Sequence, residues 1–526
     1  MEKMEKIDMQ KFDGYDTWKT KESVIDQPVD FDEAISLTGC GKFHIAVLLT
    51  SGLCLAGVIT ESLGMSFVLP SADCDLDMSL DEKSLLSASA FLGLVLSAHT
   101  WGFLADTKGR RYVIKWSLLF AIIFSWTSSF SHQPWMMILL RFCTGFMISG
   151  ASSTAYAYLG EFHGDKTRAR AISWGASFIS VGMLCLPAMA WAVLPLPFNY
   201  HIPLLDINYN SWRVYMLMCS IPCLLSFILI SFLPETPKFL LARGRTDETL
   251  DVLTRMYISN KGGDSMDYPV RSVNRIESDS NVKAENLREI ASLMLRQTLP
   301  LFRAPLLKYT LLVCLVQFGI FATSSGMYMW FPMIANNLFL YYEKFERNGG
   351  VCTVLASKDA ITVESTDQDQ CTSNVNPDVF LLTLIFGTCF SSLYIIIGIV
   401  INILGNKNIL ITMLTVCGAA AITINFVEEH NFLVTCFGGL LASGVAVGVL
   451  NTIAVDLFPT HYRAMALCLS MMVGRLGASA GSHAIGYMLE YWCDGVFFVL
   501  GSILIACAVI TIFIPRRNPH LLTPTN

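Results

Sequence analysis

The chain has 526 residues, of which 53% are hydrophobic and only 15% are charged, with a formal net charge of −6. A soluble protein of this length would carry about 25% charged residues, so the composition excludes an ordinary soluble protein and favours one that spans a membrane. No basic patch points to nucleic acid. The segment Gly39–Lys42 lacks the spacing and the hydroxyl residue of a phosphate-binding loop, and the cysteines lack zinc-ligand spacing. We therefore expect no enzyme, no cofactor and no metal site.

The first 43 residues are polar and charged, which predicts a cytoplasmic N-terminal segment rather than a cleavable signal peptide. Twelve apolar windows follow, and each is long enough to cross the hydrocarbon core as a helix. They lie near residues 44–70, 84–104, 112–131, 136–159, 170–195, 213–233, 308–338, 378–402, 409–427, 432–456, 464–489 and 495–515. The sequence therefore predicts an all-α membrane protein with twelve transmembrane helices.

A long polar stretch divides these windows into two sets of six. We expect an N-terminal six-helix bundle over residues 44–234, a cytoplasmic linker over 235–307, and a C-terminal six-helix bundle over 308–515 that includes an outer loop over 339–377. Residues 516–526 form the expected cytoplasmic tail. Lys and Arg gather in the loops after helices 2, 4, 6, 8 and 10, which predicts that these loops and both termini are cytoplasmic. The loop after helix 7 also holds Lys and Arg and is the exception.

One short loop concentrates charge between two apolar windows: the sequence GFLADTKGRR, from Gly102 to Arg111, joins helices 2 and 3. Its pattern recurs 296 positions later, where Gly398, Asn402, Gly405, Asn406 and Lys407 correspond to Gly102, Asp106, Gly109, Arg110 and Arg111. A second pattern recurs 295 positions later, where Asp456, Pro459, Arg463 and Ala464 correspond to Glu161, Gly164, Arg168 and Ala169. Two patterns with nearly the same offset indicate that the halves are a parallel structural repeat.

We expect the charged loop to be a latch that holds one access state. Gly102 and Gly109 permit close backbone approach and unusual dihedral angles. Asp106 can face the positive end of a neighbouring helix, and Arg110 and Arg111 can clamp carboxylates. Anchoring by positive charge alone is the alternative, but it requires neither the glycines nor Asp106. Two further ion pairs are expected at cytoplasmic helix ends as parts of the gate: Glu161 with Arg168, and Asp456 with Arg463.

These motifs carry a resemblance to a known family. GFLADTKGRR resembles the signature loop of the major facilitator superfamily, and RFCTGFMISG, from Arg141 to Gly150, resembles its fourth-helix motif. LPETPKFLLARGR, from Leu233 to Arg245, is similar to the block that ends helix 6 in its sugar and organic-ion porters. The resemblance covers nearly the whole chain. It implies two six-helix bundles that work by alternating access, and it implies a gating role for Arg141.

A narrower resemblance rests on three short segments. SFVLPSA at the end of helix 1, AMAWA in helix 5 and MWFP in helix 7 resemble the synaptic vesicle glycoprotein 2 family and its insect relatives. The chain departs from that family in helix 1, where only Glu61 remains of an acidic pair, and in helix 10, where Asn451 replaces an acidic residue. Its outer loop is short, and the chain contains no N-glycosylation sequon. The specificity of that family therefore does not transfer as a whole.

Two charged residues stand out within the apolar windows, Glu61 in helix 1 and Arg475 in helix 11. Such a charge costs about 3 kcal/mol unless it meets a partner or water. We predict that both residues line the substrate site. Glu61 is expected to bind a cationic group or to carry a proton, and Arg475 is expected to pair with Glu61 across the cavity or to bind an anionic group. A solvated Glu61 near its helix end and an Arg475 bonded to a backbone carbonyl are the alternatives.

Five other residues are expected to bind substrate. Trp191, Tyr328 and Trp330 follow from the family resemblance, and Gln317 and Asn451 are polar residues within spans. Tryptophan can stack on a ring or cover a cation, but it also marks the membrane interface. Amide side chains can bind a solute, but they also join helices by hydrogen bonds. Both alternatives stay open at this point.

Four cysteines fall in expected outer loops: Cys74, Cys352, Cys371 and Cys493. That side faces an oxidising space at the cell surface or inside a vesicle. Cys352 and Cys371 share one loop, so we predict that they form a disulfide, while pairings that link different loops stay open.

The sequence favours a secondary transporter or uniporter of a small polar organic solute, a sugar or an organic ion, that works by alternating access. The alternative is a non-transporting vesicle membrane protein that keeps the transporter fold as a scaffold for ligands and partners. The expected partners are a small-molecule substrate and the lipid bilayer, with proton coupling left open and no nucleic acid. We expect a monomer in the plasma membrane or in an intracellular vesicle.

Overall fold

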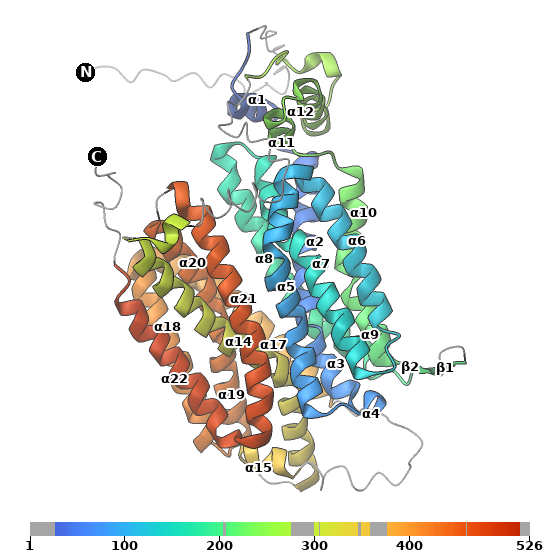
Figure 1. Cartoon of the computed structure of the whole chain (residues 1–526), viewed down its shortest axis with the longest axis vertical. Helices are drawn as coiled ribbons and strands as arrows, with labels where there is room; N and C mark the ends of the chain where they lie inside the picture. Colours follow the sequence, from blue (N-terminus) through green and yellow to red (C-terminus); the bar gives the residue numbers. More distant parts are fainter. Residues whose placement is uncertain are drawn as a thin grey trace, which may run out of the picture.

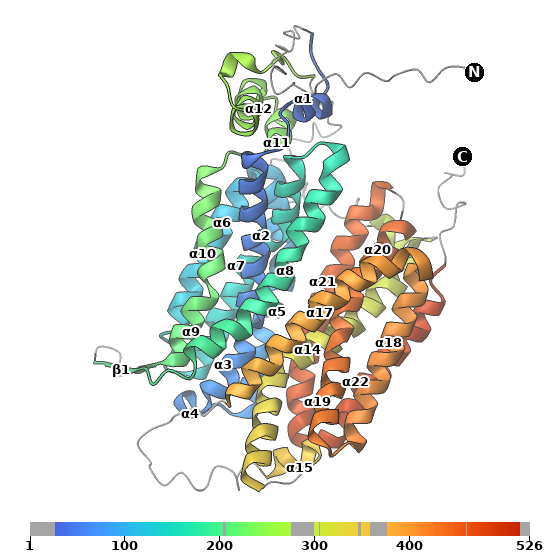
Figure 2. The ribbon, with the colours of Figure 1, turned by 180° about the vertical axis from the view of Figure 1, so that it is seen from behind.

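The computed structural model describes residues 27–203, 207–274, 299–304, 306–345, 349–357, 376–458 and 460–515. This part of the chain is almost entirely helical, and its long helices form two bundles side by side (Figure 1). A short hairpin of β1 (Asn199–Ile202) and β2 (Ile207–Asn210) projects from one end of the N-terminal bundle (Figure 2). Its strands are antiparallel, with Asn199 opposite Asn210.

The N-terminal bundle contains two spans that are each made of two helices. Its helices are α2 (Lys42–Leu63) with α3 (Met65–Ser71), α5 (Leu80–Lys108), α6 (Arg110–Ser128), α7 (Pro134–Glu161), α8 (Asp165–Val193), and α9 (Ser211–Cys219) with α10 (Ile221–Phe232). The short α4 (Asp73–Leu76) follows α3. A capping box starts α5, because the Ser79 hydroxyl accepts the Glu82 N–H while the Glu82 carboxylate accepts the Ser79 N–H.

The C-terminal bundle repeats this arrangement. Its helices are α14 (Leu306–Phe345), α17 (Pro377–Leu404), α18 (Asn406–Thr423) with η3 (Ile424–Phe426), the interrupted span of α19 (His430–Leu441), η4 (Ala442–Val445) and α20 (Ala446–Leu457), then α21 (Thr460–Tyr491) and α22 (Cys493–Ile512). The short η2 (Leu299–Phe302) precedes α14. The short α15 (Val351–Ala356) packs against α14.

Parts of the N-terminal segment and of the linker pack together beyond one end of the N-terminal bundle, which we call the linker end (Figure 1). They contain α1 (Phe31–Leu37), α11 (Pro237–Ala242), α12 (Thr246–Lys261) and η1 (Ser265–Asp267). Val29 pairs with Val273 in an isolated bridge, and the Tyr268 hydroxyl donates to the Ala34 carbonyl at 2.8 Å. The Asn260 amide donates to the Thr38 and Gly39 carbonyls at 3.2 Å. The opposite end of the bundles is called the loop end.

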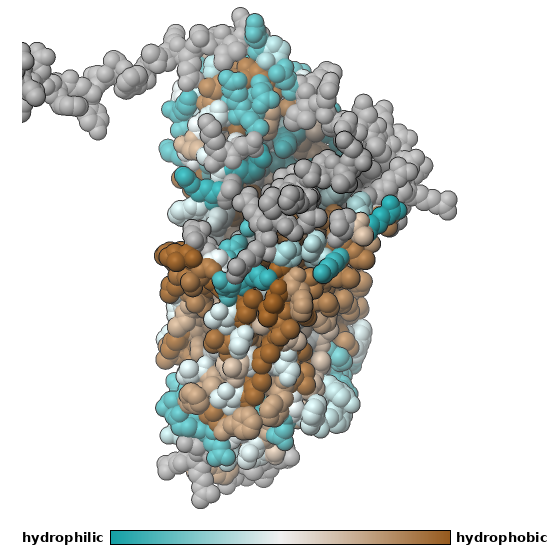
Figure 3. Space-filling view, turned by 90° about the vertical axis from the view of Figure 1, so that its left-hand side faces the viewer, coloured by the Kyte–Doolittle hydropathy of each residue, from teal (hydrophilic) through white to brown (hydrophobic). Residues whose placement is uncertain are grey.

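The described helices fit a membrane-spanning protein. Nine of them are long and apolar enough to cross a bilayer, and α5 is a tenth when its two bent halves are counted as one span. Both remaining bundle helices, α6 and α21, carry more charged or small polar residues. Figure 3 shows apolar side chains gathered in a broad belt between polar regions at the two ends. The described part of the chain therefore contains the twelve helices that the sequence predicts.

One expectation about the loop end is wrong. Cys352 in α15 forms its disulfide with Cys493, the first residue of α22, with the Cα atoms 5.7 Å apart. The predicted partner, Cys371, lies outside the described residues, as does the side chain of Cys74. Sharing a loop made Cys371 the nearer candidate in sequence. The docking of α15 beside the end of α14 instead carries Cys352 to a residue 141 positions later in the chain.

Candidate functional site

The turn between α5 and α6 is built around one partly buried carboxylate. Gly109 joins the two helices with φ +106°, and a Cβ there would lie 2.2 Å from Glu235 Oε2. The Glu235 carboxylate accepts the backbone N–H groups of Arg110 and Arg111 at 3.0 Å. It also accepts the N–H of Thr236 at 3.0 Å. Glu235 therefore caps the N-terminus of α6, where the helix dipole favours a negative charge.

Burial raises the pKa of the Glu235 carboxyl above its ordinary value, while the N–H groups of Arg111, Thr236, Tyr112 and Arg110 lower it. Protonation of the Glu235 carboxyl therefore competes with its role as acceptor of these N–H groups. The sequence identified the block that holds Glu235 but gave this residue no role. Its position directly after Pro234 and before Thr236 and Pro237 was the available signal, because a proline-bounded break after a helix is a frequent place for a side chain to cap a neighbour.

The charged side chains of the same turn form a network that stays within the N-terminal bundle. Arg110 pairs with Asp106 at 3.1 Å and with Glu161, at the end of α7, at 3.1 Å. The Thr236 hydroxyl donates to Glu161 at 2.6 Å. The Arg111 guanidinium donates to the Ile230 and Ser231 carbonyls at 3.2 and 2.7 Å. We call Asp106, Arg110, Arg111, Glu161 and Glu235 the N-terminal latch.

Two predicted gate residues lie differently from expectation. Gly102 was expected to permit close backbone approach, but a Cβ there would meet nothing within 4 Å, because the side of α5 that it occupies has no close neighbour in this conformation. Arg168 reaches out of the bundle and forms an ion pair of 3.7 Å with Asp32 of α1. Its guanidinium also donates to the Gly160 carbonyl at 3.2 Å.

The corresponding turn between α17 and α18 is weaker. Gly405 keeps a positive φ of +80°, but a Cβ there would meet nothing within 4 Å. The Asn406 amide donates to Asp456 at 3.4 Å, and Lys407 donates to the Ile512 and Ile514 carbonyls at 2.7 and 2.6 Å. The predicted pair of Asp456 with Arg463 cannot be traced, because the Arg463 side chain lies outside the described part.

The predicted pairing of Glu61 with Arg475 is wrong. Glu61 Oε2 pairs instead with Arg141 Nη1 at 2.7 Å, and the side chains are only 2% and 1% exposed. Arg141 is therefore part of the bundle core rather than of a gate at the linker end. Helix rotation explains the error, since α2 turns Glu61 toward α7 of its own bundle instead of toward α21. The Ser125 hydroxyl of α6 donates to the same carboxylate oxygen at 3.0 Å.

This buried ion pair has unused hydrogen-bonding capacity. Within the described residues, Glu61 Oε1, Arg141 Nε and the Tyr215 hydroxyl have no hydrogen-bond partner. Arg141 and Tyr328 of α14, a buried residue of the other bundle, both lie near Tyr215. The predicted residue Tyr328 therefore lies near the ion pair. Buried polar atoms normally have a hydrogen-bond partner, so this cluster stands out from the rest of the bundle core.

The two bundles touch closely along α5 and α21 in the half that is nearer the loop end. Ser482 and Ser87 hydroxyls lie 2.7 Å apart, and the Ser479 hydroxyl donates to the Ala88 carbonyl at 3.2 Å. A Cβ at Gly486 would lie 2.1 Å from Ser84 Oγ, so only glycine allows this approach. The predicted residue Trp330 is fully buried beside this contact, where its indole N–H donates to the Ser482 carbonyl at 2.7 Å. We call this contact the α5–α21 seam.

The seam ends at Arg475. Its guanidinium crosses to the other bundle and donates to the Ser152 hydroxyl of α7 at 2.6 Å. Tyr156 of α7 and Cys468 lie near this guanidinium. Cys468, Arg475 and Ser482 are seven residues apart in turn, so all three lie on one face of α21. Arg475 and Ser482 contact the other bundle on this face, but Cys468 is exposed. The bundles therefore part between Arg475 and Cys468.

The remaining predicted residues divide into two groups. Gln317 of α14 and Asn451 of α20 both donate to the Met471 sulfur, at 3.2 and 3.8 Å, one turn before Arg475. Trp191 is 51% exposed at the end of α8 nearer the loop end, so it is not enclosed in a cavity. Sequence reasoning missed Ser152, Tyr156 and Met471, because common residue types within a span carry no individual signal.

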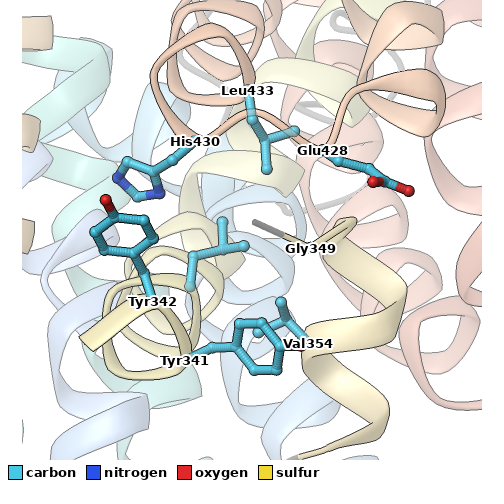
Figure 4. A pocket seen from close by; sticks show the side chains of 8 residues that line it. Tyr341, Tyr342, Gly349, Val354, Glu428, His430 and Leu433 are labelled. Atoms are coloured by element: carbon cyan, nitrogen blue, oxygen red, sulfur yellow. The ribbon is translucent and has the colours of Figure 1, made fainter. Parts of the chain in front are cut away.

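A small pocket at the loop end of the C-terminal bundle contains none of the predicted residues. Its lining comes from the end of α14, from Gly349, α15 and the start of α19, and Figure 4 shows Tyr342 beside His430. These two rings stack with centroids 5.4 Å apart. Glu428 contributes to the lining but its carboxylate points away from the two rings (Figure 4). The lining includes no residue of the seam or of the latch.

Comparison with known proteins identifies the architecture. The family profile of the Major Facilitator Superfamily matches residues 49–354 and 375–526. Superposition on the xylose transporter XylE from E. coli in its inward open conformation covers 91% of this chain and 97% of XylE, with a TM-score of 0.62 and 14% identity. Superposition on a point mutant of the nucleoside transporter NupG covers 90% of this chain and all of the NupG chain, with a TM-score of 0.58 and 13% identity. These structural matches concern the fold.

Among curated sequences, the chain is similar to synaptic vesicle glycoproteins 2. It is 28% identical to glycoprotein 2C of Rattus norvegicus over 327 residues, which are 59% of this chain and 45% of that protein. It is 29% identical to glycoprotein 2B of Homo sapiens over 317 residues, 56% of this chain and 45% of that protein. It is 31% identical to glycoprotein 2A of Rattus norvegicus over 241 residues, 46% of this chain and 32% of that protein. The chain thus spans less than half the length of these relatives.

Proposed function

Because the chain belongs to the Major Facilitator Superfamily, we propose that it is a secondary transporter or uniporter that moves a small polar organic solute by alternating access. The unequal contact between the bundles carries this proposal. The seam packs closely at Ser87 and Ser482, whereas Gly102, about five turns along the same face of α5 from Ser84, faces open space. Two bundles that meet along half their length can rock about that contact and close the other half.

We further propose that the linker end faces the cytoplasm, because the loops at that end hold most of the lysines and arginines. The conformation described here is then open to the cytoplasm and closed toward the outside. The N-terminal latch lies at the open end. Its Asp106 is 76% exposed in this conformation, which leaves the carboxylate available to the other bundle when the linker end closes.

Glu61 is the proposed site of proton coupling. It is a carboxylate in a nearly inaccessible ion pair, and one of its oxygens has no partner within the described residues. Protonation would neutralise Glu61 and leave Arg141 charged, so the pair would change its charge during a cycle. Coupling predicts that a pH gradient alone drives uptake. Glu61→Gln protein that remains folded, verified by size-exclusion chromatography, should lose this dependence and still exchange solute across the membrane.

A cross-link across the seam tests alternating access. The hydroxyl oxygens of Ser87 and Ser482 are 2.7 Å apart, so Ser87→Cys with Ser482→Cys should oxidise to a disulfide that holds the loop end closed. We expect uptake into proteoliposomes to stop on oxidation and to return on reduction. Each single cysteine variant is the matched control and should transport under both conditions. Unchanged uptake in the oxidised double variant, with the cross-link verified by mass spectrometry, would refute the rocking mechanism.

One observation favours the alternative, a membrane protein that binds ligands or partners without transport. The expected carboxylate, Glu61, is engaged by Arg141, and the expected indole, Trp330, is bonded inside the C-terminal bundle. A scaffold would not need a seam that opens. A cysteine placed at Ser87 would then stay unreactive toward a membrane-impermeant maleimide from the outside under every solute and pH condition, and uptake would be absent throughout.

A further inference from the structure

Arg475 lies where the close contact between the two bundles ends. On its loop-end side the seam is tight, with Ser479 bonded to Ala88 at 3.2 Å. On its linker-end side the same face of α21 is exposed at Cys468. Tyr394 of α17 is 43% exposed and lies near Tyr156, the neighbour of Arg475. The guanidinium therefore lies where a solute that enters from the linker end would come to rest.

In the part of the chain that the structure describes, the charge of Arg475 is not balanced by a carboxylate, unlike the charges of the fully buried Arg141 and Arg213. Ion pairs with a carboxylate are formed by Arg110, Arg141, Arg168, Arg213 and Arg245. Within the described residues, the hydrogen bond of Arg475 goes to the neutral Ser152, and the nearby side chains of Tyr156 and Cys468 carry no carboxylate. An unbalanced positive charge within a membrane span is costly, so an anion that reaches it would be stabilised.

Two hydrogen-bond acceptors lie one turn away. Gln317 Oε1 and Asn451 Oδ1 are buried and have no donor within the described part, although the nitrogens of the same amides donate to Met471. Sulfur is a weak acceptor and methionine is an adaptable side chain. A ligand that displaces Met471 would therefore gain two amide acceptors. Hydroxyl or amino groups satisfy such acceptors, whereas a second carboxylate would not.

We infer that Arg475 binds the anionic group of the transported solute, and that this solute is a small organic monoanion with hydroxyl or amino groups. A single guanidinium balances a single negative charge, and its planar fork matches a carboxylate. The anion replaces the Ser152 hydroxyl as the partner of Arg475. The inference rests on the proposed transport function and narrows its substrate class.

The native Cys468 provides the test. It lies two turns from Arg475 on the same face of α21 and is exposed, so a solute bound at Arg475 should shield it from alkylation. Purified full-length protein is treated with a maleimide in the presence of gluconate, glycerate or lactate, and labelling of each cysteine is followed by mass spectrometry. Glucose is the neutral match to gluconate, and the exposed Cys40 is the internal control.

We expect at least one of the three monoanions to slow Cys468 labelling about tenfold at saturation, with glucose and Cys40 unaffected. Arg475→Lys keeps the charge but not the fork and should weaken protection by about tenfold, which corresponds to about 1.4 kcal/mol. Arg475→Gln should abolish it, and Arg170→Gln, at an exposed position of α8, should leave it unchanged. Arg475→Lys also covers the case in which Arg475→Gln fails to fold.

Two results would overturn the inference: protection of Cys468 by glucose as strong as by gluconate, or no protection by any of the three monoanions. The seam cross-link separates this failure from failure of the transport function. If the cross-link stops uptake of a neutral solute, transport stands and the anion site falls. If monoanions protect Cys468 but no solute is taken up, the anion site stands and transport falls.

Discussion

In the N-terminal bundle, the turn after α5 is held by a partly buried carboxylate that accepts three backbone N–H groups, whereas the corresponding turn after α17 in the C-terminal bundle has open space at the same place. Gly109 and Gly405 both adopt a positive φ, of +106° and +80°. Arg111 and Lys407 both donate to carbonyls at the end of the sixth helix of their own bundle. The backbone and these carbonyl bonds are thus repeated, while the charge network is confined to one half.

The sequence after the sixth helix of each bundle explains the difference. Leu233 and Pro234 precede Glu235 in the first half, and Ile514 and Pro515 precede Arg516 in the second. The second half therefore has a basic residue where the first has the capping carboxylate, and Arg516 lies outside the described residues. A cation cannot accept the N–H groups of α18. The repeat conserves the turn geometry, and the N-terminal half alone carries the side chains that can make the turn respond to charge.

The cores of the two bundles differ in the same direction. Arg141 of α7 is balanced by Glu61, and the position 295 residues later is Cys436, a buried neutral residue of α19. Charge inside and at the linker end of the N-terminal bundle gives that half several sites whose state can change with pH or with a partner. The C-terminal half contributes Arg475 and neutral surfaces. The variants below test this division of roles, from the largest expected effect to the smallest.

Breaking the buried ion pair should have the largest effect. Glu61→Gln and Arg141→Gln each leave one buried charge without its partner, so each should lower the free energy of unfolding by about 3–5 kcal/mol. The matched change in the other half, Cys436→Ala, should cost about 1 kcal/mol. Chemical unfolding in detergent, monitored by tryptophan fluorescence, measures all three. The double variant should recover part of the loss, and strictly additive losses would show that the two side chains are not coupled.

Removing the arginine of the latch should have the next largest effect. Arg110→Ala removes ion pairs with Asp106 and Glu161, both at 3.1 Å, and should cost about 1.5–3 kcal/mol. Asn406→Ala removes only a contact of 3.4 Å to the exposed Asp456 and should stay within about 0.5 kcal/mol. The same unfolding assay applies. Equal losses would mean that the C-terminal turn depends on contacts as strong as those of the N-terminal latch.

The two turn glycines provide a closer comparison. Ala at either position must combine a positive φ with an extended ψ, of 157° at Gly109 and 140° at Gly405, which costs about 1–3 kcal/mol. At Gly109 the added methyl group also collides with Glu235, whereas at Gly405 it meets nothing within 4 Å. Gly109→Ala should therefore be less stable than Gly405→Ala by about 1 kcal/mol or more, through loss of the cap. A smaller loss at Gly109 than at Gly405 would show that Glu235 moves aside without cost.

The sequence was sufficient for the architecture because the architecture depends on periodic and repeated signals. Apolar windows, a polar linker and two motifs with nearly equal offsets predict two six-helix bundles, and they also bring Asp106 and Arg110 to one turn. Helix rotation and loop docking leave no such trace. Arg141 and Arg475 were both possible partners of Glu61 from sequence. Arg141 belonged to a recognised motif and was given a gating role, so Arg475 was paired with Glu61, which is wrong. Cys352 likewise had a neighbour in its own loop, while its true partner lies 141 residues away.

Residues that matter because of what surrounds them were harder still. Ser152 and Met471 are ordinary components of a span, and only the packed structure shows that one bonds Arg475 and the other covers two amides. Trp330 carries a family signal, yet its indole N–H is used inside its own bundle. A motif predicts that a residue is constrained, but the partner that constrains it follows from tertiary contacts.

The smallest effect concerns the pH dependence of the cap. Burial raises the pKa of the folded-state Glu235 carboxyl above the ordinary value of about 4.3. The folded protein therefore binds this proton more readily than the unfolded chain. The resulting stabilisation is complete below the unfolded pKa and is lost as the pH rises through the folded pKa. Glu235→Gln cannot take up the proton, so the melting temperature of the native protein relative to this variant should be higher at pH 5 than at pH 8. Glu248→Gln, in the exposed pair with Arg245, controls for the loss of one surface carboxylate. If the melting temperature of the native protein relative to the variant instead rises toward pH 8, the N–H groups of Arg110, Arg111 and Thr236 lower the pKa of Glu235 by more than burial raises it. The N-terminal latch would then be strongest with Glu235 charged.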